Sequence, residues 1–151
     1  IILTSMGRIF KFDLSNTNLN PNTKQSQGLL LVNLLPKKKI VSCCQSKNRG
    51  IVYLISKKAK FFKLEIDEIF NAHHSKLGYL NDKIQLKNDN FIKILPNNQY
   101  IDIETNKNRS ARINFNKLTS ITNKNLIKIN FFDLEEDEYL ENCFRLDSFM
   151  N

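Results

Sequence analysis

The expected fold follows from a stretch near the start of the chain, Leu3-Thr4-Ser5-Met6-Gly7-Arg8-Ile9-Phe10-Lys11-Phe12. The same pattern returns as Ile55-Ser56-Lys57-Lys58-Ala59-Lys60-Phe61-Phe62-Lys63-Leu64. In each copy, apolar residues lead into a polar turn, a small residue (Gly7 or Ala59) lies at the bend, and an alternating strand follows. Each copy therefore predicts a β-hairpin with a basic tip.

The strand that follows each bend has two different faces. Phe10 and Lys11 fall on opposite faces, and Lys63 takes the place of Lys11 in the second copy. This alternation predicts a core on one side of the hairpin and positive charge on the other. A third and weaker copy spans residues 105–113, where Arg112 takes the place of Lys11.

The copies are evenly spaced along the chain. Gly7 and Ala59 are 52 positions apart, and Ala59 and Asn108 are 49 apart. A second set of apolar residues keeps the same period: Val32, Leu34 and Ile40, then Ile84, Leu86 and Ile92, then Phe132, Leu134 and Leu140. A period near 50 residues predicts propeller-like or solenoid repeats.

We therefore expect an all-β chain that forms a single domain of three repeat units, at about residues 1–50, 51–99 and 100–151. Each unit has strands at both ends and a polar connection between them. Since repeats of this kind pack on their neighbours, three units leave two apolar flanks uncovered. The isolated chain is then expected to aggregate or self-associate.

Positive charge is unevenly distributed. The 151 residues carry a formal net charge of +8. Residues 1–118 hold 20 Lys and Arg against 8 Asp and Glu, whereas residues 119–151 hold 3 against 7. A basic body indicates a polyanionic partner such as nucleic acid. The alternative is a compositional bias, because 18 Lys against 5 Arg beside 21 Asn is typical of an AT-rich genome.

Other chemistry has little support in the sequence. Cys43 and Cys44 are adjacent and Cys143 is distant, so no Cys-x-x-Cys or Cys/His ligand spacing indicates zinc, and a reduced intracellular setting fits best. His73 and His74 have no carboxylate or Cys partner at ligand spacing and are interpreted as a surface loop. There is no secretory signal, bilayer-spanning apolar run or nucleotide-binding glycine pattern. We expect no catalytic residue, metal or cofactor on this segment.

The acidic run near the end of the chain has two interpretations. It comprises Asp133, Glu135, Glu136, Asp137, Glu138 and Glu141. The run lacks the interleaved Gly, Asn or Ser of a calcium loop, and a catalytic role is disfavoured. One interpretation is a solvated turn. The other is an acidic surface that repels DNA, so that a DNA path ends or is redirected there.

A family resemblance rests on three of these features: the stretch at residues 3–12, the period near 50 residues, and a strand led by Gly28 that closes a polar loop. Together they resemble the C-terminal domain of the bacterial DNA gyrase A subunit and the related domain of the topoisomerase IV A subunit. That resemblance implies a β-pinwheel, a propeller-like ring of four-stranded blades, of which this chain would supply about three. It also implies that duplex DNA binds and bends around the basic rim, independently of base sequence, in support of ATP-dependent supercoiling.

The resemblance carries further expectations. The DNA-binding residues would be Arg8, Lys11, Lys24, Lys37, Lys38, Lys39, Lys57, Lys58, Lys60, Lys63, Lys107, Arg109 and Arg112. The partners would be double-stranded DNA, the remainder of the A subunit and the ATPase B subunit, with ATP and Mg bound elsewhere in the enzyme. The location would be the cytoplasm, at the bacterial nucleoid, or a plastid.

One departure leaves the type of enzyme open. Gyrase-type members carry a basic, Gly-rich box, and the nearest stretch here, Lys24-Gln25-Ser26-Gln27-Gly28, keeps only a Gln and a Gly of it. Gyrase-like and topoisomerase-IV-like behaviour therefore both remain open. The rival hypothesis from another class is a propeller-like protein-interaction module that does not bind DNA.

Overall fold

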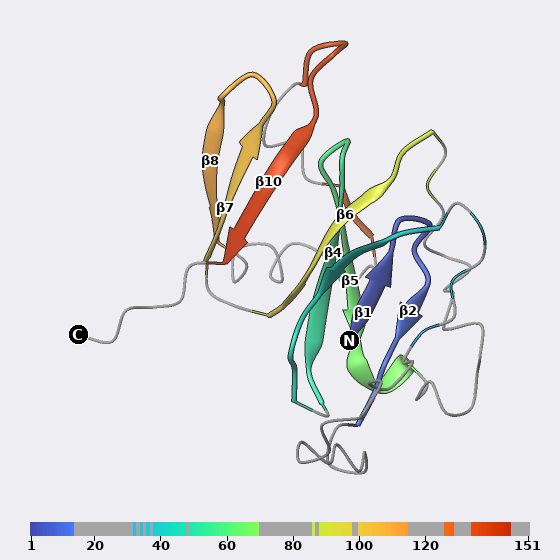
Figure 1. Ribbon diagram of the computed structural model, residues 1–151. Helices are drawn as coiled ribbons and strands as arrows, with labels where there is room; N and C mark the ends of the chain where they lie inside the picture. The colour runs from blue at the N-terminus through green and yellow to red at the C-terminus, as the bar shows by residue number, and fades with distance from the viewer. Residues whose placement is uncertain are drawn as a thin grey trace, which may run out of the picture.

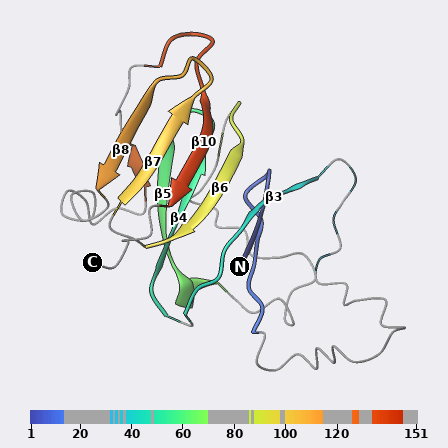
Figure 2. The same ribbon diagram turned by 60° about the vertical axis from the view of Figure 1, so that its left-hand side comes forward.

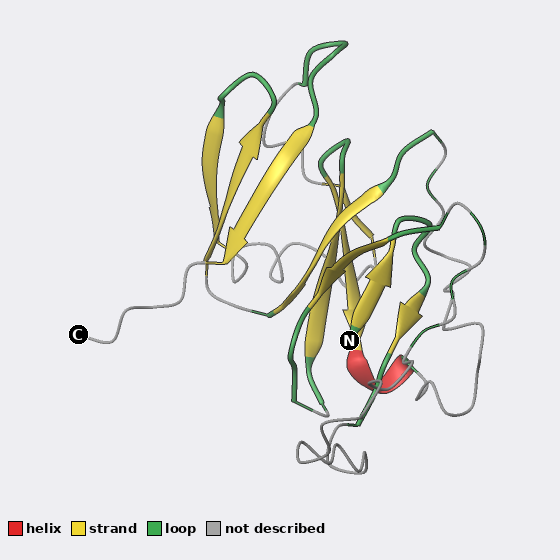
Figure 3. Ribbon diagram, in the orientation of Figure 1, coloured by secondary structure: helices red, strands yellow, loops and turns green. Residues whose placement is uncertain are grey.

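The described part of the chain folds into three antiparallel β-sheets. The computed structural model describes residues 1–13, 32, 34, 36, 38–47, 49–69, 86, 88–97, 100–114, 126–128 and 134–145. Within these residues the structure consists of strands and one short 3₁₀ helix, η2 (Ile66–Glu68), which follows the second hairpin (Figure 3). The expectation of an all-β chain is confirmed.

Each sheet contains one of the predicted hairpins. The first sheet consists of β1 (Ile2–Thr4), β2 (Ile9–Phe10) and β3 (Ile40–Cys43). The second sheet consists of β4 (Ile51–Ser56), β5 (Lys60–Glu65), β6 (Phe91–Pro96) and β9 (Leu126–Lys128). The third sheet consists of β7 (Tyr100–Thr105), β8 (Ser110–Asn114) and β10 (Leu140–Arg145).

The three sheets share one topology. In each, the first strand of the hairpin is central, the second strand lies on one side of it and a later strand lies on the other, giving the orders β2-β1-β3, β5-β4-β6 and β8-β7-β10. The second sheet has a fourth strand, because β9 pairs with β5. Since residues 126–128 lie in the third repeat unit by sequence, a strand of that unit completes the sheet of the unit before it.

The register between strands also repeats. The first residue of the third strand pairs with a hydroxyl residue at the end of the first strand, and a β-bulge follows each time. The pairs are Thr4 with Ile40, Ser56 with Phe91, and Thr105 with Leu140. The predicted equivalence of Ile40 with Ile92 is therefore wrong by one position, because Ile92 is the extra residue of the bulge in the second sheet.

The bend of each hairpin uses a left-handed residue at the same place. The φ angle is 80° at Gly7, 54° at Ala59 and 58° at Asn108. Glycine adopts this conformation without strain and asparagine tolerates it, whereas alanine does so at a cost. The three residues that the repeat spacing matched in the sequence are therefore the same structural position.

A buried hydroxyl stabilises each of these turns. The residue after the bend donates its backbone N–H to a Thr or Ser side chain four positions earlier. The bonds run from Arg8 to Thr4 at 3.0 Å, from Lys60 to Ser56 at 3.2 Å, and from Arg109 to Thr105 at 3.3 Å. The residue that donates this bond, immediately after the left-handed residue, is basic in all three turns.

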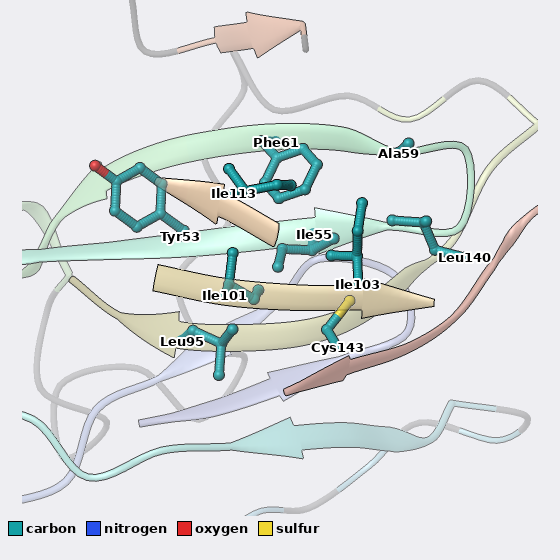
Figure 4. Close-up of a cluster of buried hydrophobic side chains, with 10 residues drawn as sticks. All are labelled: Tyr53, Ile55, Ala59, Phe61, Leu95, Ile101, Ile103, Ile113, Leu140 and Cys143. Carbon is teal, nitrogen blue, oxygen red and sulfur yellow. The ribbon is translucent and has the colours of Figure 1, made fainter. Parts of the chain in front are cut away.

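The sheets stack face to face in chain order, with the second sheet in the middle (Figure 2). The first and second sheets bury a cluster whose large members include Leu3, Ile9, Val52, Leu54, Phe62, Leu64, Phe91 and Ile94. The second and third sheets bury Tyr53, Ile55, Ala59, Phe61, Leu95, Ile101, Ile103, Ile113, Leu140 and Cys143 (Figure 4). Burial of these apolar side chains on both sides of the second sheet is the main source of stability.

The middle position of the second sheet overturns one expectation. Lys63 was predicted to lie on a charged face of its strand, opposite the core. Phe61, which shares that face, is fully buried against the third sheet, and Lys63 itself is half-buried beside Tyr53. Both faces of β5 are therefore core, because a sheet lies on each side of it.

The face of the third sheet that points away from the second sheet is mostly polar. One position on this face shows the difference. In the first two sheets it is taken by Leu3 and Ile55, which are buried, and in the third sheet it is taken by Glu104. In the same way Ser110, which is exposed, stands where Phe61 is buried. Among the described residues, this outer face is therefore less apolar than the flanks on which the expectation of self-association was based, although Tyr100 and Phe144 are exposed on it.

Replacement of Gly7 by alanine is expected to destabilise the fold. The new Cβ would lie 2.7 Å from Cε2 of Phe91, and the left-handed backbone alone costs about 1–2 kcal/mol for a residue other than glycine. We expect a free energy of unfolding lower by at least this amount, measured by urea denaturation. Asn108→Gly is the matched control, because it relaxes the equivalent bend and should leave the midpoint unchanged or higher. Equal decreases in the free energy of unfolding for Gly7→Ala and Asn108→Gly would contradict the equivalence of the two bends.

Candidate nucleic-acid interface

The three hairpin tips lie on the same side of the molecule, along its upper side in Figure 1. We call them the first tip (residues 5–8), the second tip (57–60) and the third tip (106–109). In each unit a backbone bond joins the tip to the segment that leads into the third strand: Ser5 N–H to Lys39 O at 2.9 Å, Lys57 N–H to Asn90 O at 2.9 Å, and Asn106 N–H to Tyr139 O at 3.1 Å. We call the three tips and these lead-in segments the tip edge.

A buried carboxylate supports the second tip. Oδ1 of Asp89 accepts the backbone N–H groups of Lys58 at 3.2 Å and Asn90 at 2.8 Å, and Oδ2 lies 3.8 Å from Nζ of Lys60. The Asp89 side chain has no exposed surface, whereas the Lys60 side chain is 31% exposed. The carboxylate therefore holds the turn and offsets the charge of Lys60.

The second tip is also fixed against the third sheet. The N–H of Leu140 donates to the carbonyl oxygen of Lys57 at 2.8 Å, and Nζ of Lys57 lies 4.6 Å from the centroid of the Tyr139 ring. Such a cation over an aromatic face is stabilising. Lys57 and Lys58 are exposed, and Lys58 forms no ion pair with any described residue.

Glu138 occupies the same place under the third tip. Its Oε1 accepts the hydroxyl of Thr105 at 2.8 Å and lies 3.0 Å from Nε of Arg109. Its Oε2 accepts the N–H of Glu135 at 3.2 Å. Burial alone would raise the pKa of Glu138, but these hydrogen bonds and the charges of Arg109 and Lys107 outweigh it, so the pKa lies below its usual value.

The rest of the acidic run folds against the third tip. We call residues 135–138 the acidic loop. Nζ of Lys107 forms an ion pair with Oε2 of Glu135. The side chain of Asn106 donates to the carbonyl oxygen of Asp137 at 3.1 Å and accepts the N–H of Tyr139 at 2.9 Å. Both cations of the third tip are therefore paired with carboxylates of this loop.

The first tip differs from the other two in one respect. By the repeat of strand pairing, Lys38 stands where the second and third units have Asp89 and Glu138. Lys39, which follows it, is exposed and forms no ion pair with any described residue. The charge of the tip edge therefore changes from one unit to the next. The described part of the first unit contributes Arg8, Lys38 and Lys39 and no acid, the second has three Lys against Asp89, and the third has two cations against four carboxylates.

The remaining predicted residues lie away from the tip edge or outside the described part. Nζ of Lys11 donates to the carbonyl oxygen of Ile66 at 3.3 Å, which links the first sheet to η2. Arg112 lies within β8 and forms two bonds to Asp102, at 2.8 and 3.0 Å, which lower the pKa of that carboxyl. Lys24 and Lys37 lie outside the described residues, as do His73 and His74.

Sequence reasoning missed the two buried carboxylates, although a signal was present. Asp89 lies 29 positions after Lys60, and Glu138 lies 29 positions after Arg109. Matched acids at a fixed offset from matched cations indicate an ion pair that the repeat preserves. The sequence interpretation of the acidic run treats it as a surface, whereas one of its members, Glu138, is buried and structural.

The structure brings the three cysteines to one cavity of about 340 Å³ at the third-strand edges of the sheets. Cys43 and Cys44 line it from the first sheet and Cys143 from the third, with Lys93 and Leu95 between them. Burial raises the pKa of the Cys143 thiol to about 12, whereas Cys43 is exposed. The described residues include no cluster of three or more Cys, His, Asp or Glu placed to hold a metal ion.

Comparison with known proteins gives no family assignment, because no protein-family model and no curated protein matches the sequence. Among the described residues there is no helix that combines the length and the apolar character needed to cross a membrane.

The pKa of Glu138 makes stability depend on pH. Because the pKa is lowered in the folded state, the carboxylate stabilises the fold above its unfolded value, about 4.3, and that contribution is lost as the pH falls through the folded value. Glu138→Gln should lower the thermal midpoint at pH 7, and its midpoint should approach that of wild type as the pH falls through the lowered folded-state pKa of Glu138. The exposed Glu136→Gln serves as control and should follow wild type throughout. A difference in thermal midpoint between Glu138→Gln and wild type that stays constant with pH would contradict the lowered pKa of Glu138.

The thiols should differ in reactivity. At pH 8 an alkylating reagent should modify Cys43 first, whereas Cys143 should react only when the protein unfolds, because its thiolate is not populated. Peptide mapping by mass spectrometry after timed alkylation measures this order. Modification of Cys143 as fast as Cys43 in the native protein would contradict the packing of the third sheet on the second.

Proposed function

We propose that this chain binds duplex DNA without sequence preference through the tip edge, and bends it around stacked β-sheets. The observation that carries the proposal is the repeated tip: three turns of one geometry, each with a basic residue after the bend, lie on one side of the molecule. Regularly placed cations suit the phosphate backbone, which is the same for every base sequence.

The spacing of the tips supports this match. Stacked sheets lie about 10 Å apart, and successive phosphates of one DNA strand lie about 3.4 Å apart along the helix axis. Adjacent tips would thus meet about every third phosphate. Because backbone hydrogen bonds hold the short turns that carry the cations, little backbone conformational entropy is lost on binding.

The contacts divide the thirteen predicted residues into groups with different expected contributions. Strong contributions are expected from Arg8, Lys38, Lys39, Lys57 and Lys58, which lie at the first two tips. Lys60 should contribute less, because Asp89 offsets its charge. Lys11, Lys63 and Arg112 lie within or beside strands rather than at the tips, and the third tip is neutralised by its own loop.

The wider assignment follows the sequence resemblance. We propose that the sheets are blades of a β-pinwheel and that the chain is the DNA-wrapping domain of a type IIA topoisomerase A subunit. The repeated topology and the head-to-tail stacking support this architecture. The partners would then be DNA, the rest of the A subunit and the ATPase B subunit, in the cytoplasm or a plastid. Catalysis and ATP binding would occur elsewhere in the enzyme.

One observation favours a second candidate, a protein-interaction module. On the outer face of the third sheet, Tyr100 is 40% exposed and Phe144 is 53% exposed, beside the ion pair of Asp102 and Arg112. Aromatic and Arg side chains are enriched at protein interfaces. A protein bound there through apolar contacts should be retained at salt concentrations that release DNA.

The salt dependence of DNA affinity tests the main proposal. We expect log K for a random duplex of about 40 base pairs to fall with log salt with a slope of about −4 to −5 if five cations meet phosphates. Lys39→Gln combined with Lys58→Gln should reduce the magnitude of that slope by about 2. Fluorescence anisotropy over a series of salt concentrations measures it.

The matched control is Lys47→Gln combined with Arg49→Gln. It removes the same charge from exposed residues after β3, at the end of the first sheet remote from the tips. We expect this control to keep the wild-type slope. Failure of the folded protein to bind at 50 mM salt, or equal effects of the two double variants, would reject the tip edge as the DNA site.

A further inference from the structure

The third tip has the geometry of a DNA contact but not the charge. Its bend, its hydroxyl bond and its basic residues match those of the first two tips. Yet Lys107 and Arg109 both pair with the acidic loop, which also leaves Glu136 and Asp137 exposed. With four carboxylates against two cations, this end of the tip edge would repel a phosphate backbone.

We infer that the acidic loop ends the DNA path: it neutralises the third tip, so that DNA meets the first two tips and leaves the protein at the third sheet. This inference rests on the proposed function. The loop would act as an internal competitor, since its carboxylates occupy the cations that phosphates would otherwise bind.

The attachment of the loop supports a fixed role. Besides the ion pairs, backbone and side-chain bonds join Asn106 to Asp137 and Tyr139, and the buried Glu138 bonds Thr105. A merely solvated acidic turn would need none of these bonds. The carboxylate of Glu135 is therefore held beside Lys107 in the absence of DNA and does not have to be recruited.

A second feature of the third sheet is independent of charge at the tips. Its outer face has Glu104 and Ser110 at positions that are apolar and buried in the first two sheets. A polar outer face is typical of the terminal layer of a repeat stack. The change in the outer face and the neutralised tip thus both occur in the third unit.

The electrostatic range of the loop limits its effect to the third tip. At physiological salt, interactions between exposed charges are screened over about 8 Å, which is less than the spacing of about 10 Å between stacked sheets. The loop therefore neutralises its own tip strongly and the second tip weakly. This is a boundary at one layer rather than a general loss of affinity.

A double-mutant cycle in the chain of residues 1–151 tests the inference. The loop variant Glu135→Gln, Glu136→Gln, Asp137→Asn removes three exposed carboxylates and keeps the buried Glu138, so the turn under the tip stays intact. We expect the slope of log K against log salt, for the same duplex, to become steeper by about 1 as Lys107 is released to a phosphate.

The cycle is completed by Lys107→Gln. In the wild-type background this change should leave the slope unchanged, because Glu135 already neutralises Lys107. In the loop variant it should abolish the gain of about 1. Equal effects of Lys107→Gln in both backgrounds would overturn the inference, as would a loop variant whose slope equals that of wild type.

A control for net charge is Glu65→Gln, Asp67→Asn, Glu68→Gln, which removes three exposed carboxylates at and beside η2, remote from the tips. It should keep the wild-type slope, and a gain equal to that of the loop variant would overturn the inference. Failure of the proposed function itself would give a different result. Either the wild type would not bind DNA at 50 mM salt, or Lys39→Gln combined with Lys58→Gln would not reduce the slope of log K against log salt. Circular dichroism verifies folding of every variant.

Discussion

The structure depends on one local interaction, the hydrogen bond from the first backbone N–H after each bend to a buried hydroxyl. Thr4, Ser56 and Thr105 are nearly or fully buried, so their oxygens need partners, and the turn supplies them. The bond closes the turn around a left-handed residue and fixes the direction in which the next basic residue leaves. The same hydroxyl residue pairs with the first residue of the third strand, so the bond also sets where that strand begins.

The sheets are built for different positions in the stack. A sheet between two others must be apolar on both faces, and the second sheet meets this demand with Tyr53 and Phe61 on one face and Leu54 and Phe62 on the other. The third sheet has a buried apolar cluster on its inner face, whereas its outer face is mostly polar with Tyr100 and Phe144 exposed. The backbone is therefore repeated while the side chains are not, which is how a repeat protein distinguishes an inner layer from an outer one.

Much of this could be predicted from the sequence, because local patterns determine local structure. The hairpins and their shared bend position, at Gly7, Ala59 and Asn108, follow from alternation and turn chemistry. What could not be predicted depends on contacts between distant segments. The bulge that places Phe91 rather than Ile92 opposite Ser56 is a property of strand pairing, and the burial of both faces of β5 requires knowledge of its neighbouring sheets. For residues such as Lys24, which lie outside the described part, the sequence interpretation stays a prediction.

The charge of each tip is decided away from the tip. A basic residue follows the bend in all three units, so the cations at the bends do not explain why the three tips differ in net charge. The difference comes from the segment that leads into the third strand, where Lys38, Asp89 and Glu138 occupy one position. An acid at this position both supports the turn and neutralises its cation, whereas a lysine adds charge and leaves the turn to its backbone bonds. The residue at this one position therefore affects both the stability of the turn and the positive charge of the tip. An acid there favours stability, a lysine favours charge, and the three units differ in this choice.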